Sequence, residues 1–589
     1  MFGKIKYITE GEAHIESKIE PGQDVDLMNS NVIFEAPNQA ILGEVEEVND
    51  DTIKIRFLGE FINGRYVSGV IRKPLLSSNI RMINKEELQE LMGTYNDKTF
   101  KLGQSAIYKD YPVCVNINDL LSNHMAIFGN SGSGKSCGVA RIVQNLFSNP
   151  NFIAYNANIF IFDAYGEYKT AFGKINQINP NYSYKFITTN PTDPTDQLLQ
   201  IPVHLLNLDD LTLLLQASSH TQIPILERTL KLAKIFAEVS DESRIYKNHL
   251  IAKALLAILF SNETTKQKKN EVFQIIQVCH TPEFNFDTEV QGLGYSRKFS
   301  DCFEIDSKGN FGESVLINDY ILKFINDDLE GKIVPKDVYY TLKDLANALE
   351  FTLISEGFQH NETLYDDAIV LKVRLNSIIN SNIGSYFNYP SYITAEQYIS
   401  SLVAMPNRRK AQIINFNINY IDDRLAKTIT KIYAKLLFDY SKNMEQKASF
   451  PFHIVLEEAH RYVQNDNDIY LLGYNIFDRI TKEGRKYGVL LGLITQRPSE
   501  LSETAISQCS NFLIFKVQHP KDVGYIKEMV PNITEEEIKK IKMLPPGMCM
   551  AFGSGFKLPV LVKFAMPNPE PNSRSANITE SWFVDVGGK

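Results

Sequence analysis

The sequence predicts an α/β protein with a nucleotide-binding core, a small β-barrel before that core and a helical segment inserted into it. Three observations lead to this prediction. A glycine-rich loop joins a short apolar strand to a helix within residues 124–137. Apolar strands further along the chain end in polar or acidic residues, as strands do at the ligand-binding edge of a parallel sheet. Between these strands, residues 186–395 lose the α/β alternation and show long patterns of helical period.

The glycine-rich loop, HMAIFGNSGSGKSC, matches the pattern G-x-x-x-x-G-K-[ST], which binds the phosphates of a nucleoside triphosphate. Its glycines let several backbone N–H groups converge on one phosphate, Lys135 can reach the β and γ phosphates, and the Ser136 hydroxyl can ligate Mg²⁺. Apolar residues on both sides supply the strand and helix that the motif requires. A Gly/Ser surface loop is the alternative. The predicted nucleotide-binding residues here are Gly129, Asn130, Ser131, Gly132, Ser133, Gly134, Lys135, Ser136 and Cys137.

A first carboxylate cluster follows the next predicted strand, Asn158–Phe162. The strand ends in Asp163-Ala-Tyr-Gly-Glu-Tyr168, and the carboxyl end of a parallel strand is where α/β sheets bind ligands. Asp163 and Glu167 are therefore candidate nucleotide-site residues. A local turn formed by Asp163 and Gly166 is the competing interpretation.

Two adjacent carboxylates, Glu457 and Glu458, end the predicted strand Phe452–Leu456. In a phosphoryl-transfer site two such groups have separate tasks, support of Mg²⁺ and activation of the attacking water. We assign metal support to Glu457 and water activation to Glu458. The alternative is a pair of exposed glutamates that begin the next helix.

Polar side chains also follow the predicted strand Val489–Ile494, in the order Thr-Gln-Arg-Pro. Gln496 can hydrogen-bond the γ phosphate or the attacking water. Arg485 and Arg497 are candidates for stabilising the charge of the transition state, and a guanidinium from a neighbouring subunit can contribute about 10³–10⁵ in rate. A solvated surface charge is the alternative for each arginine.

Composition indicates a soluble globular protein, with 44% hydrophobic and 22% charged residues. No stretch approaches the ~20 apolar residues of a membrane helix, and the N-terminus lacks a signal-peptide core, so we expect a cytoplasmic protein with no membrane partner. Six widely spaced cysteines argue against a disulfide framework or a zinc site. The net charge of −9 argues against an extended basic surface that binds nucleic acid. It is compatible with DNA contacts confined to a small basic channel.

The chain is long enough for three or four units of about 150 residues. Residues 1–92 alternate as short strands do, and closure into a β-barrel would hide their edges. The tail from residue 566 is rich in Pro, Asn and Ser, yet contains the only tryptophan, so we expect it to dock on another surface. The predicted parts are a barrel at 1–92, the core at 93–185 and 396–565, the helical insertion at 186–395 and the tail at 566–589.

The motif order GNSGSGKS, FDAYGEY, VLEEAH, EGRKYG and LITQRP resembles the HerA family of the HerA–FtsK superfamily. The resemblance implies a RecA-like ATPase that uses ATP and Mg²⁺, with an N-terminal HAS-type barrel and a C-terminal segment that braces the neighbouring subunit. It further implies a homohexamer acting on double-stranded DNA. By the same resemblance Lys135 and Ser136 contact phosphate and Mg²⁺, Glu458 is the catalytic glutamate, Arg485 is an arginine finger acting in trans, and Gln496 is a sensor.

Two positions depart from the family pattern. Glu457 stands where relatives often carry aspartate, and Asn123-His124 stands where many relatives have Arg-His. The second change removes one possible charge contact at a subunit boundary, so reduced or partner-dependent ATPase activity is expected.

Two functions follow as hypotheses. The first is an ATP-driven motor that threads double-stranded DNA through the ring and works with a separate effector, a nuclease or a sirtuin-like NADase, in anti-phage defence or DNA-end processing. The second is a hexameric scaffold in which ATP binding controls assembly of that effector, with little translocation. Pumping of DNA at a membrane is the least favoured, because the sequence has no spanning segment.

Overall fold

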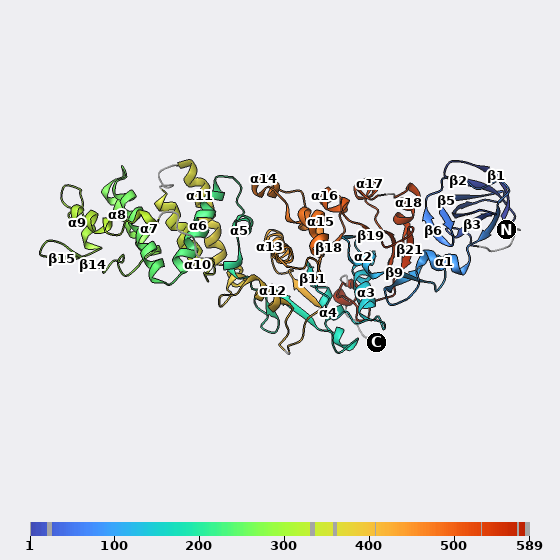
Figure 1. The fold of residues 1–589 in the computed structure, drawn as a ribbon, viewed down its shortest axis with the longest axis horizontal. Coiled ribbons are helices and arrows are strands. Elements are labelled where there is room, and N and C mark those ends of the chain that lie inside the picture. Colours follow the sequence, from blue (N-terminus) through green and yellow to red (C-terminus); the bar gives the residue numbers. More distant parts are fainter. Residues whose placement is uncertain are drawn as a thin grey trace.

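The structure, a computed structural model, describes residues 2–19, 26–329, 336–356, 362–406, 408–531, 533–573 and 577–583. The molecule is elongated, with an N-terminal sheet at one end, a large mixed sheet in the middle and a helical segment at the other end (Figure 1). The large sheet and its flanking helices therefore join the two end parts.

The N-terminal part is a seven-stranded antiparallel sheet in the order β1-β2-β5-β4-β3-β7, with β6 paired to β5. Side chains alternate between its faces, and one face forms a core of its own that includes Ile15, Phe34 and Ile53. Ile33 and Leu42 on the other face pack with the central sheet. No described pairing joins β1 to β7, so closure into a HAS-type barrel stays a prediction. The strands are β1 (Phe2–Ile8), β2 (Glu12–Ser17), β3 (Asn31–Ala36), β4 (Gln39–Val48), β5 (Thr52–Ile62), β6 (Arg65–Ser68) and β7 (Asn79–Met82).

The central sheet has twelve strands in the order β13-β12-β16-β11-β17-β18-β10-β19-β20-β21-β8-β9. The strands from β13 to β19 run parallel, so their carboxyl ends share one edge of the sheet. β18 lies between the phosphate-loop strand β10 and the strand β17. The parallel strands are β10 (Met125–Phe128), β11 (Ile159–Asp163), β12 (Tyr184–Thr188), β13 (Gln197–Leu198), β16 (Ile413–Asn417), β17 (Phe452–Leu456), β18 (Val489–Thr495) and β19 (Asn511–Ile514).

Antiparallel strands extend the sheet beyond β19: β20 (Met548–Gly553), β21 (Val560–Lys563), β8 (Thr99–Ser105) and β9 (Pro112–Asn116). Helices cover both faces of the parallel half. Phe160 and Phe162 of β11 belong to the core under α13 (Asp423–Lys442) and α15 (Ile476–Tyr487). Their neighbours Ile159 and Ile161 belong to the core under α3 (Lys135–Phe147) and α4 (Tyr168–Phe172). Strand alternation thus makes β11 apolar on both sides, as a doubly covered parallel strand requires.

The helical segment leaves the sheet after β12 and returns before β16, which is the parallel neighbour of β12. α10 lies at its centre, because it contacts α6, α7, α8 and α11. Its helices are α5 (Leu208–Leu214), α6 (Gln222–Ala237), α7 (Asp241–Leu259), α8 (Thr265–Val278), α9 (Ser314–Leu322), α10 (Leu342–Ser355), α11 (Glu362–Ile379) and α12 (Ala395–Val403). A two-stranded hairpin, β14 (Glu289–Gln291) and β15 (Ser296–Lys298), lies near its far end (Figure 1).

Shorter helices complete the two sheet parts. α18 joins them, because Lys540 on this helix lies 2.8 Å from Glu44 of the N-terminal sheet. The α-helices outside the segment are α1 (Lys85–Met92), α2 (Ile117–Leu121), α14 (Asp468–Leu472), α16 (Glu503–Ser507), α17 (Pro520–Met529), α18 (Glu535–Met543) and α19 (Ile578–Trp582). Short 3-10 turns occur at Ile175–Gln177, Val203–Leu205, Asp301–Phe303, Asp327–Leu329, Asn382–Phe387, Ala459–Arg461 and Pro498–Glu500.

The first part of the C-terminal tail docks on its own chain. Gln144 of α3 accepts the Asn568 N–H at 2.9 Å and donates to the Pro569 carbonyl at 2.9 Å. The Asn572 N–H donates to the Glu167 carbonyl at 2.8 Å. Residues 568–572 therefore dock on α3 and on the start of α4 in the same protomer. Bracing of a neighbouring subunit by the rest of the tail stays a prediction, and Trp582 is 76% exposed.

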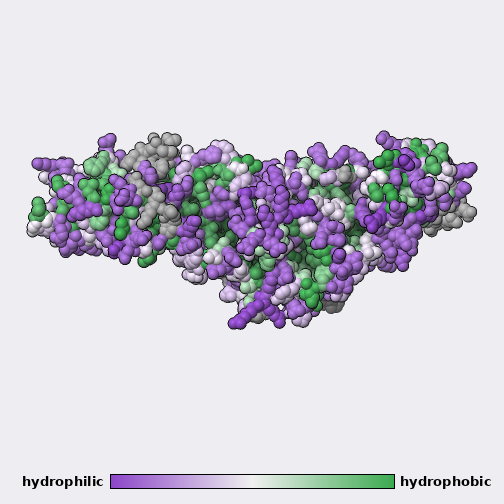
Figure 2. Space-filling model, viewed as in Figure 1, coloured by the Kyte–Doolittle hydropathy of each residue, from purple (hydrophilic) through white to green (hydrophobic). Residues whose placement is uncertain are grey.

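The surface is hydrophilic over most of the face in Figure 2, with small apolar patches over the helical segment and near the N-terminal sheet. Among the residues that the structure describes, no helix is both long enough and apolar enough to span a bilayer. All six cysteines are free thiols, and five of them are buried. The five buried ones fill space in the interior.

Candidate functional site

The phosphate loop connects β10 to α3 and is shaped by left-handed glycines. Gly132 and Gly134 have φ of 74° and 87°, and residues with a side chain rarely adopt such positive values. A Cβ on Gly134 would lie 2.6 Å from the backbone nitrogen of Gly547, whose N–H donates to the Ser133 carbonyl at 2.9 Å. The Ser133 hydroxyl is buried and has no hydrogen-bond partner. A tightly held loop with an unpaired donor fits a bound phosphate.

Lys135 is buried in the site beside a carboxylate. Its Nζ lies 3.1 Å from Glu457 Oε1, and the two residues are 5% and 1% exposed. Tyr168 donates its hydroxyl to the other oxygen, Glu457 Oε2, at 2.8 Å. Burial alone would lower the pKa of Lys135, but the charges of Glu457 and Glu458 raise it above its ordinary value. The lysine is therefore charged, and Glu457 occupies the position of its counter-ion.

Glu458 is held by side chains from two elements. Gln496, just after β18, donates its amide to Glu458 Oε1 at 2.5 Å, and His460 Nδ1 lies 3.2 Å from Glu458 Oε2. Burial would raise the pKa of Glu458, but His460, Lys135 and Gln496 together lower it below its ordinary value. Its backbone has φ 50° and ψ 48°, a left-handed conformation that is unusual for a residue with a side chain. The result is a buried, ionised carboxylate in a fixed orientation.

Thr495, the last residue of β18, links Gln496 and His460. Its Oγ1 lies 3.0 Å from His460 Nδ1 and accepts the Arg497 N–H at 2.9 Å. The Arg497 side chain is 64% exposed and pairs with Glu500 at 3.0 Å. Arg497 also lines a hollow beside the phosphate loop, together with Asn130, Ser131 and Gln496. Its guanidinium is therefore near the loop, but is directed to a surface carboxylate.

Asp163 and Glu167 differ in what they contact. Both Asp163 oxygens accept backbone N–H groups, from Glu167 at 3.0 Å and Tyr168 at 2.9 Å, and Asn415 donates to Oδ2 at 3.1 Å. This geometry favours the local-turn interpretation of Asp163. Burial raises the pKa of Glu167 to about 7, whereas a hydrogen bond with the Ser136 hydroxyl lowers it. Glu167 thus lies in the nucleotide site, next to the predicted Mg²⁺ ligand Ser136.

Arg485 is the one predicted site residue that lies at the other edge of the sheet. It is exposed near the end of α15, just before β18 begins, whereas Lys135 and Glu458 lie where the parallel strands end. Its charge reaches His124, which precedes β10. Within one chain the structure does not bring Arg485 to the phosphate loop, so any contact with a nucleotide requires a second copy.

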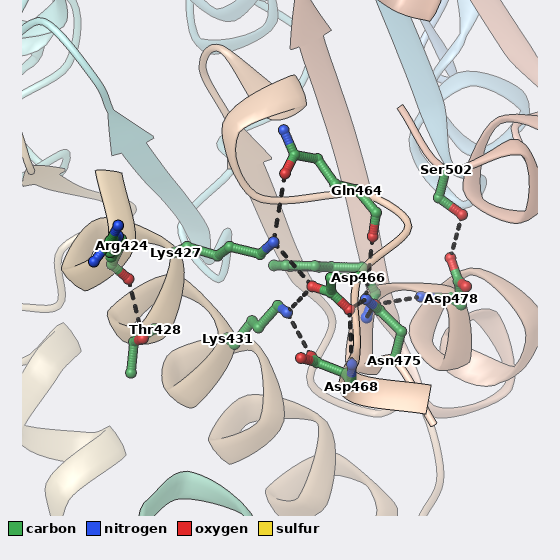
Figure 3. Close-up of polar contacts among 11 residues, drawn as sticks. Arg424, Lys427, Thr428, Lys431, Gln464, Asp466, Asp468, Asn475, Asp478 and Ser502 are labelled. Carbon is green, nitrogen blue, oxygen red and sulfur yellow. Dashed lines mark hydrogen bonds and ion pairs between the residues drawn. The ribbon is translucent and has the colours of Figure 1, made fainter. Parts of the chain in front are cut away.

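Lysines on α13 form ion pairs with acidic residues of the segment that follows Glu458 (Figure 3). Lys431 Nζ lies 2.5 Å from Asp468 Oδ2 and also contacts Asp466, and Lys427 lies 2.9 Å from Asp466. One turn further along α13, Lys435 lies 3.3 Å from Asp209 of α5. Because residues four apart share one helix face, a single row of lysines connects the residues after Glu458 to the helical segment.

Three side chains of the site were not among the sequence-predicted residues: Tyr168, His460 and Thr495. Each lies inside a motif that the sequence contains, namely GEY, EEAH and ITQRP. The sequence shows that these three residues lie next to predicted site residues. It does not show the contacts that they make with residues on other strands. Among the described residues no three His, Cys, Asp or Glu side chains gather to hold a metal ion.

Comparison with known proteins identifies relatives over most of the chain. Residues 100–285 match the family model described as "Helicase HerA, central domain". The chain is 24% identical to the "Probable helicase MJECL08" of Methanocaldococcus jannaschii, over 95% of this chain and 94% of the relative. It is 25% identical to the "DNA double-strand break repair helicase HerA" of Sulfolobus acidocaldarius, over 86% of this chain and 77% of the relative.

Solved structures with a distant likeness include VirB4 of Thermoanaerobacter pseudethanolicus, with a TM-score of 0.43 and 13% identity over 80% of this chain and 98% of that chain. The plasmid coupling protein TrwB in complex with ADP and Mg²⁺ has a TM-score of 0.42 and 12% identity over 82% of this chain and 93% of that chain.

The family-model match and the long relatives agree with the order of motifs along the chain. The same motifs meet at one edge of the sheet, where Lys135, Glu457, Glu458 and Gln496 lie together. The chain is an ATP-binding P-loop ATPase that is similar to HerA helicases over most of its length.

Proposed function

We propose that this protein is a homohexameric motor that hydrolyses ATP to translocate double-stranded DNA, and that it works with a separate effector. The observation that carries the proposal is the fixed Glu458 carboxylate, held by Gln496 just after β18, the strand between β10 and β17. A pre-oriented ionised carboxylate next to a phosphate-binding lysine is the arrangement that ATP hydrolysis needs. The DNA substrate is proposed from the names of the relatives.

The roles of the residues follow from their contacts. Backbone N–H groups of the phosphate loop and Lys135 bind the triphosphate, and Ser136 and Glu457 hold Mg²⁺, directly or through water. Mg²⁺, when bound, neutralises charge on the β and γ phosphates. Glu458 orients the attacking water and accepts its proton. Gln496 contacts Glu458 directly, so a change at the end of β18 alters the position of the catalytic group.

The proposal includes a ring because Arg485, the arginine predicted to complete the site, lies away from the phosphate loop of its own chain. The Arg485 side chain lies at the opposite edge of the sheet from the phosphate loop and is exposed to solvent. A neighbouring copy can present this edge to the site, and an arginine supplied in trans contributes about 10³–10⁵ in rate in related chemistry. The DNA then occupies a basic centre while the acidic exterior of the subunits faces solvent.

The effector is proposed to be a nuclease or a sirtuin-like NADase, in anti-phage defence or DNA-end processing. An ATP-regulated scaffold that assembles this effector is the second candidate. The helical segment favours it, because this segment extends away from the central sheet (Figure 1) and exposes apolar side chains such as Leu293 and Val315. Such side chains are suited to a protein contact.

The two candidates are separated by variants of the site. Lys135→Ala removes triphosphate binding and Glu458→Ala removes hydrolysis, while the exposed Glu528→Gln on α17 serves as a matched control. For each, we would measure ATP hydrolysis with and without duplex DNA, displacement of a DNA-bound roadblock, and co-assembly with proteins that co-purify with the chain.

A motor loses roadblock displacement in both site variants, keeps it in Glu528→Gln, and binds DNA with an affinity that falls steeply with salt. A scaffold keeps co-assembly without Glu458 and displaces no roadblock even as wild type. A lasting monomer with full turnover after Arg485→Ala would refute the ring.

A further inference from the structure

We infer that His460 is a positioning residue for hydrolysis, which holds Glu458 and links it to the end of β18 through Thr495. The inference rests on the hydrolytic role proposed for Glu458. His460 Nδ1 lies 3.2 Å from Glu458 Oε2 and 3.0 Å from Thr495 Oγ1. One ring nitrogen therefore lies within reach of both the catalytic carboxylate and the neighbouring strand.

Glu458 needs such support because its backbone is strained. A left-handed conformation costs a residue with a side chain about 1 kcal/mol or more, and it persists only where the surroundings fix it. Each of the two carboxylate oxygens has one neighbour: Oε1 accepts the Gln496 amide at 2.5 Å, and Oε2 faces His460. Loss of the imidazole would leave the carboxylate held at one oxygen only, and free to rotate about its last bond.

The hydrogen positions give this contact two states. Thr495 Oγ1 already accepts the Arg497 N–H at 2.9 Å, so its own hydrogen is available to His460 Nδ1. A hydrogen on Nδ1 leaves a polarised N–H 3.2 Å from Glu458 Oε2, a buried oxygen with no hydrogen bond of its own in the described part of the chain, and attracts that oxygen. A hydrogen on the other ring nitrogen, Nε2, turns Nδ1 into an acceptor for the Thr495 hydroxyl and removes the attraction.

The choice between these states depends on β18. Thr495 is its last residue, and the next residue, Gln496, is the other partner of Glu458. A displacement of this strand end therefore changes both contacts of the carboxylate together. We assign to His460 and Thr495 the task of passing such a displacement to Glu458.

Three substitutions at one position test the geometry with MgATP as substrate and no DNA present. His460→Ala removes the donor, and His460→Gln places its amide nitrogen near the position of Nε2. His460→Asn places an amide nitrogen near the position of Nδ1. His14→Asn, on the N-terminal sheet, is the matched control.

Loss of an outer partner of a catalytic group commonly costs about 10–100-fold in activity. We expect kcat to fall by about that factor in His460→Ala and His460→Gln, with KM for ATP within about 3-fold of wild type. His460→Asn should recover most of the lost kcat, and His14→Asn should be unchanged. The double variant His460→Ala/Thr495→Val should have nearly the same kcat as His460→Ala alone. Both substitutions interrupt the same link between Glu458 and the end of β18.

Melting temperature and binding of a fluorescent ATP analogue show that each variant is folded. A His460→Ala enzyme with kcat within 2-fold of wild type would overturn the inference. So would an Asn variant as slow as the Ala variant while equally stable, or a rise in KM with kcat unchanged. A wild-type chain that displaces no roadblock, yet shows the expected kcat pattern, would refute the proposed translocation and leave the role of His460 standing.

Discussion

Lys431→Met should destabilise the nucleotide domain, because it removes the cation from a buried cluster of charges. Lys431 is 2% exposed, and its partners Asp466 and Asp468 are 15% and 12% exposed (Figure 3). Removal of the lysine leaves two carboxylates side by side in a largely dry site. Methionine keeps the length of the side chain, so the main effect is the lost charge.

The expected size follows from the geometry. Removal of one partner of a buried ion pair costs about 3–5 kcal/mol. Asp466 still has Lys427 as an ion-pair partner at 2.9 Å in this variant. We therefore expect the lower end of that range, a loss of about 3 kcal/mol in the free energy of unfolding. At about 2–4 °C per kcal/mol for a domain of this size, the melting temperature should fall by roughly 6–12 °C.

Differential scanning calorimetry measures this change. The transition of the nucleotide domain is the one that added MgADP moves upward, because a ligand stabilises the state that binds it. Lys427→Met is the matched control. Lys427 is 23% exposed at the rim of the cluster, so its loss should cost about 1 kcal/mol or less.

Asp468→Asn in the Lys431→Met background should restore part of the loss, since it removes the carboxylate that has lost its ion-pair partner. A shift below about 2 °C for Lys431→Met, or a double variant less stable than the single one, would refute the view that Lys431 neutralises a buried acidic pair.

Three further predictions concern the rest of the molecule. Burial lowers the pKa of His124 to about 4, and its Nδ1 accepts the Leu491 N–H at 3.0 Å. The unfolded chain binds a proton at His124 near pH 6.5, whereas the folded protein binds it only near pH 4. The free energy of unfolding should therefore be constant above about pH 6.5 and decrease by up to about 3 kcal/mol as the pH falls to 4, which urea unfolding at several pH values can measure. Glu457→Gln leaves Lys135 without its buried counter-ion, so ADP should bind about tenfold more tightly in EDTA by calorimetry, while hydrolysis falls at least 100-fold. Gln144→Ala removes two hydrogen bonds to the tail, so hydrogen exchange at the backbone amides of Asn568, Glu570 and Asn572 should accelerate about tenfold.

Each of these has a control and a contradicting result. His124→Asn should reduce the pH dependence but not abolish it, because burial also lowers the pKa of the neighbouring His453 to about 4. An unchanged slope would mean that other groups cause it. Unaltered metal-free binding of ADP by Glu457→Gln would show that the lysine is not restrained by that carboxylate. Exchange that accelerates equally after Asn145→Ala, on the same helix, would show that the whole helix has loosened.

The sequence was sufficient for those parts of the site that lie in contiguous motifs. The phosphate loop needs glycines and a lysine within eight residues, and the carboxylate pair follows directly from an apolar strand, so local chemistry identifies them. The order of motifs also predicted an α/β core with a helical segment between its halves. The roles of the individual residues stay predictions that the variants above would test.

Other features depend on contacts between distant segments, which no local pattern contains. His460 meets Thr495 only because β18 is inserted between β10 and β17. The position of Asp163 at the end of a strand predicted that it would contact the nucleotide. In the structure, its two carboxylate oxygens accept hydrogen bonds from two backbone N–H groups. The tail composition predicted docking, but only the fold shows that its first part lies on α3 of the same chain.

The helical segment occupies the connection between two adjacent parallel strands, β12 and β16. A crossover of this kind needs only a dozen or so residues, about what one helix such as α12 supplies. The segment is therefore much longer than the crossover requires. Its first helix, α5, packs on α13 and belongs to the core of the sheet, so a shortened chain that retains α5 and α12 should still bind nucleotide, and the helices farther from the sheet can vary in length with less effect on the site.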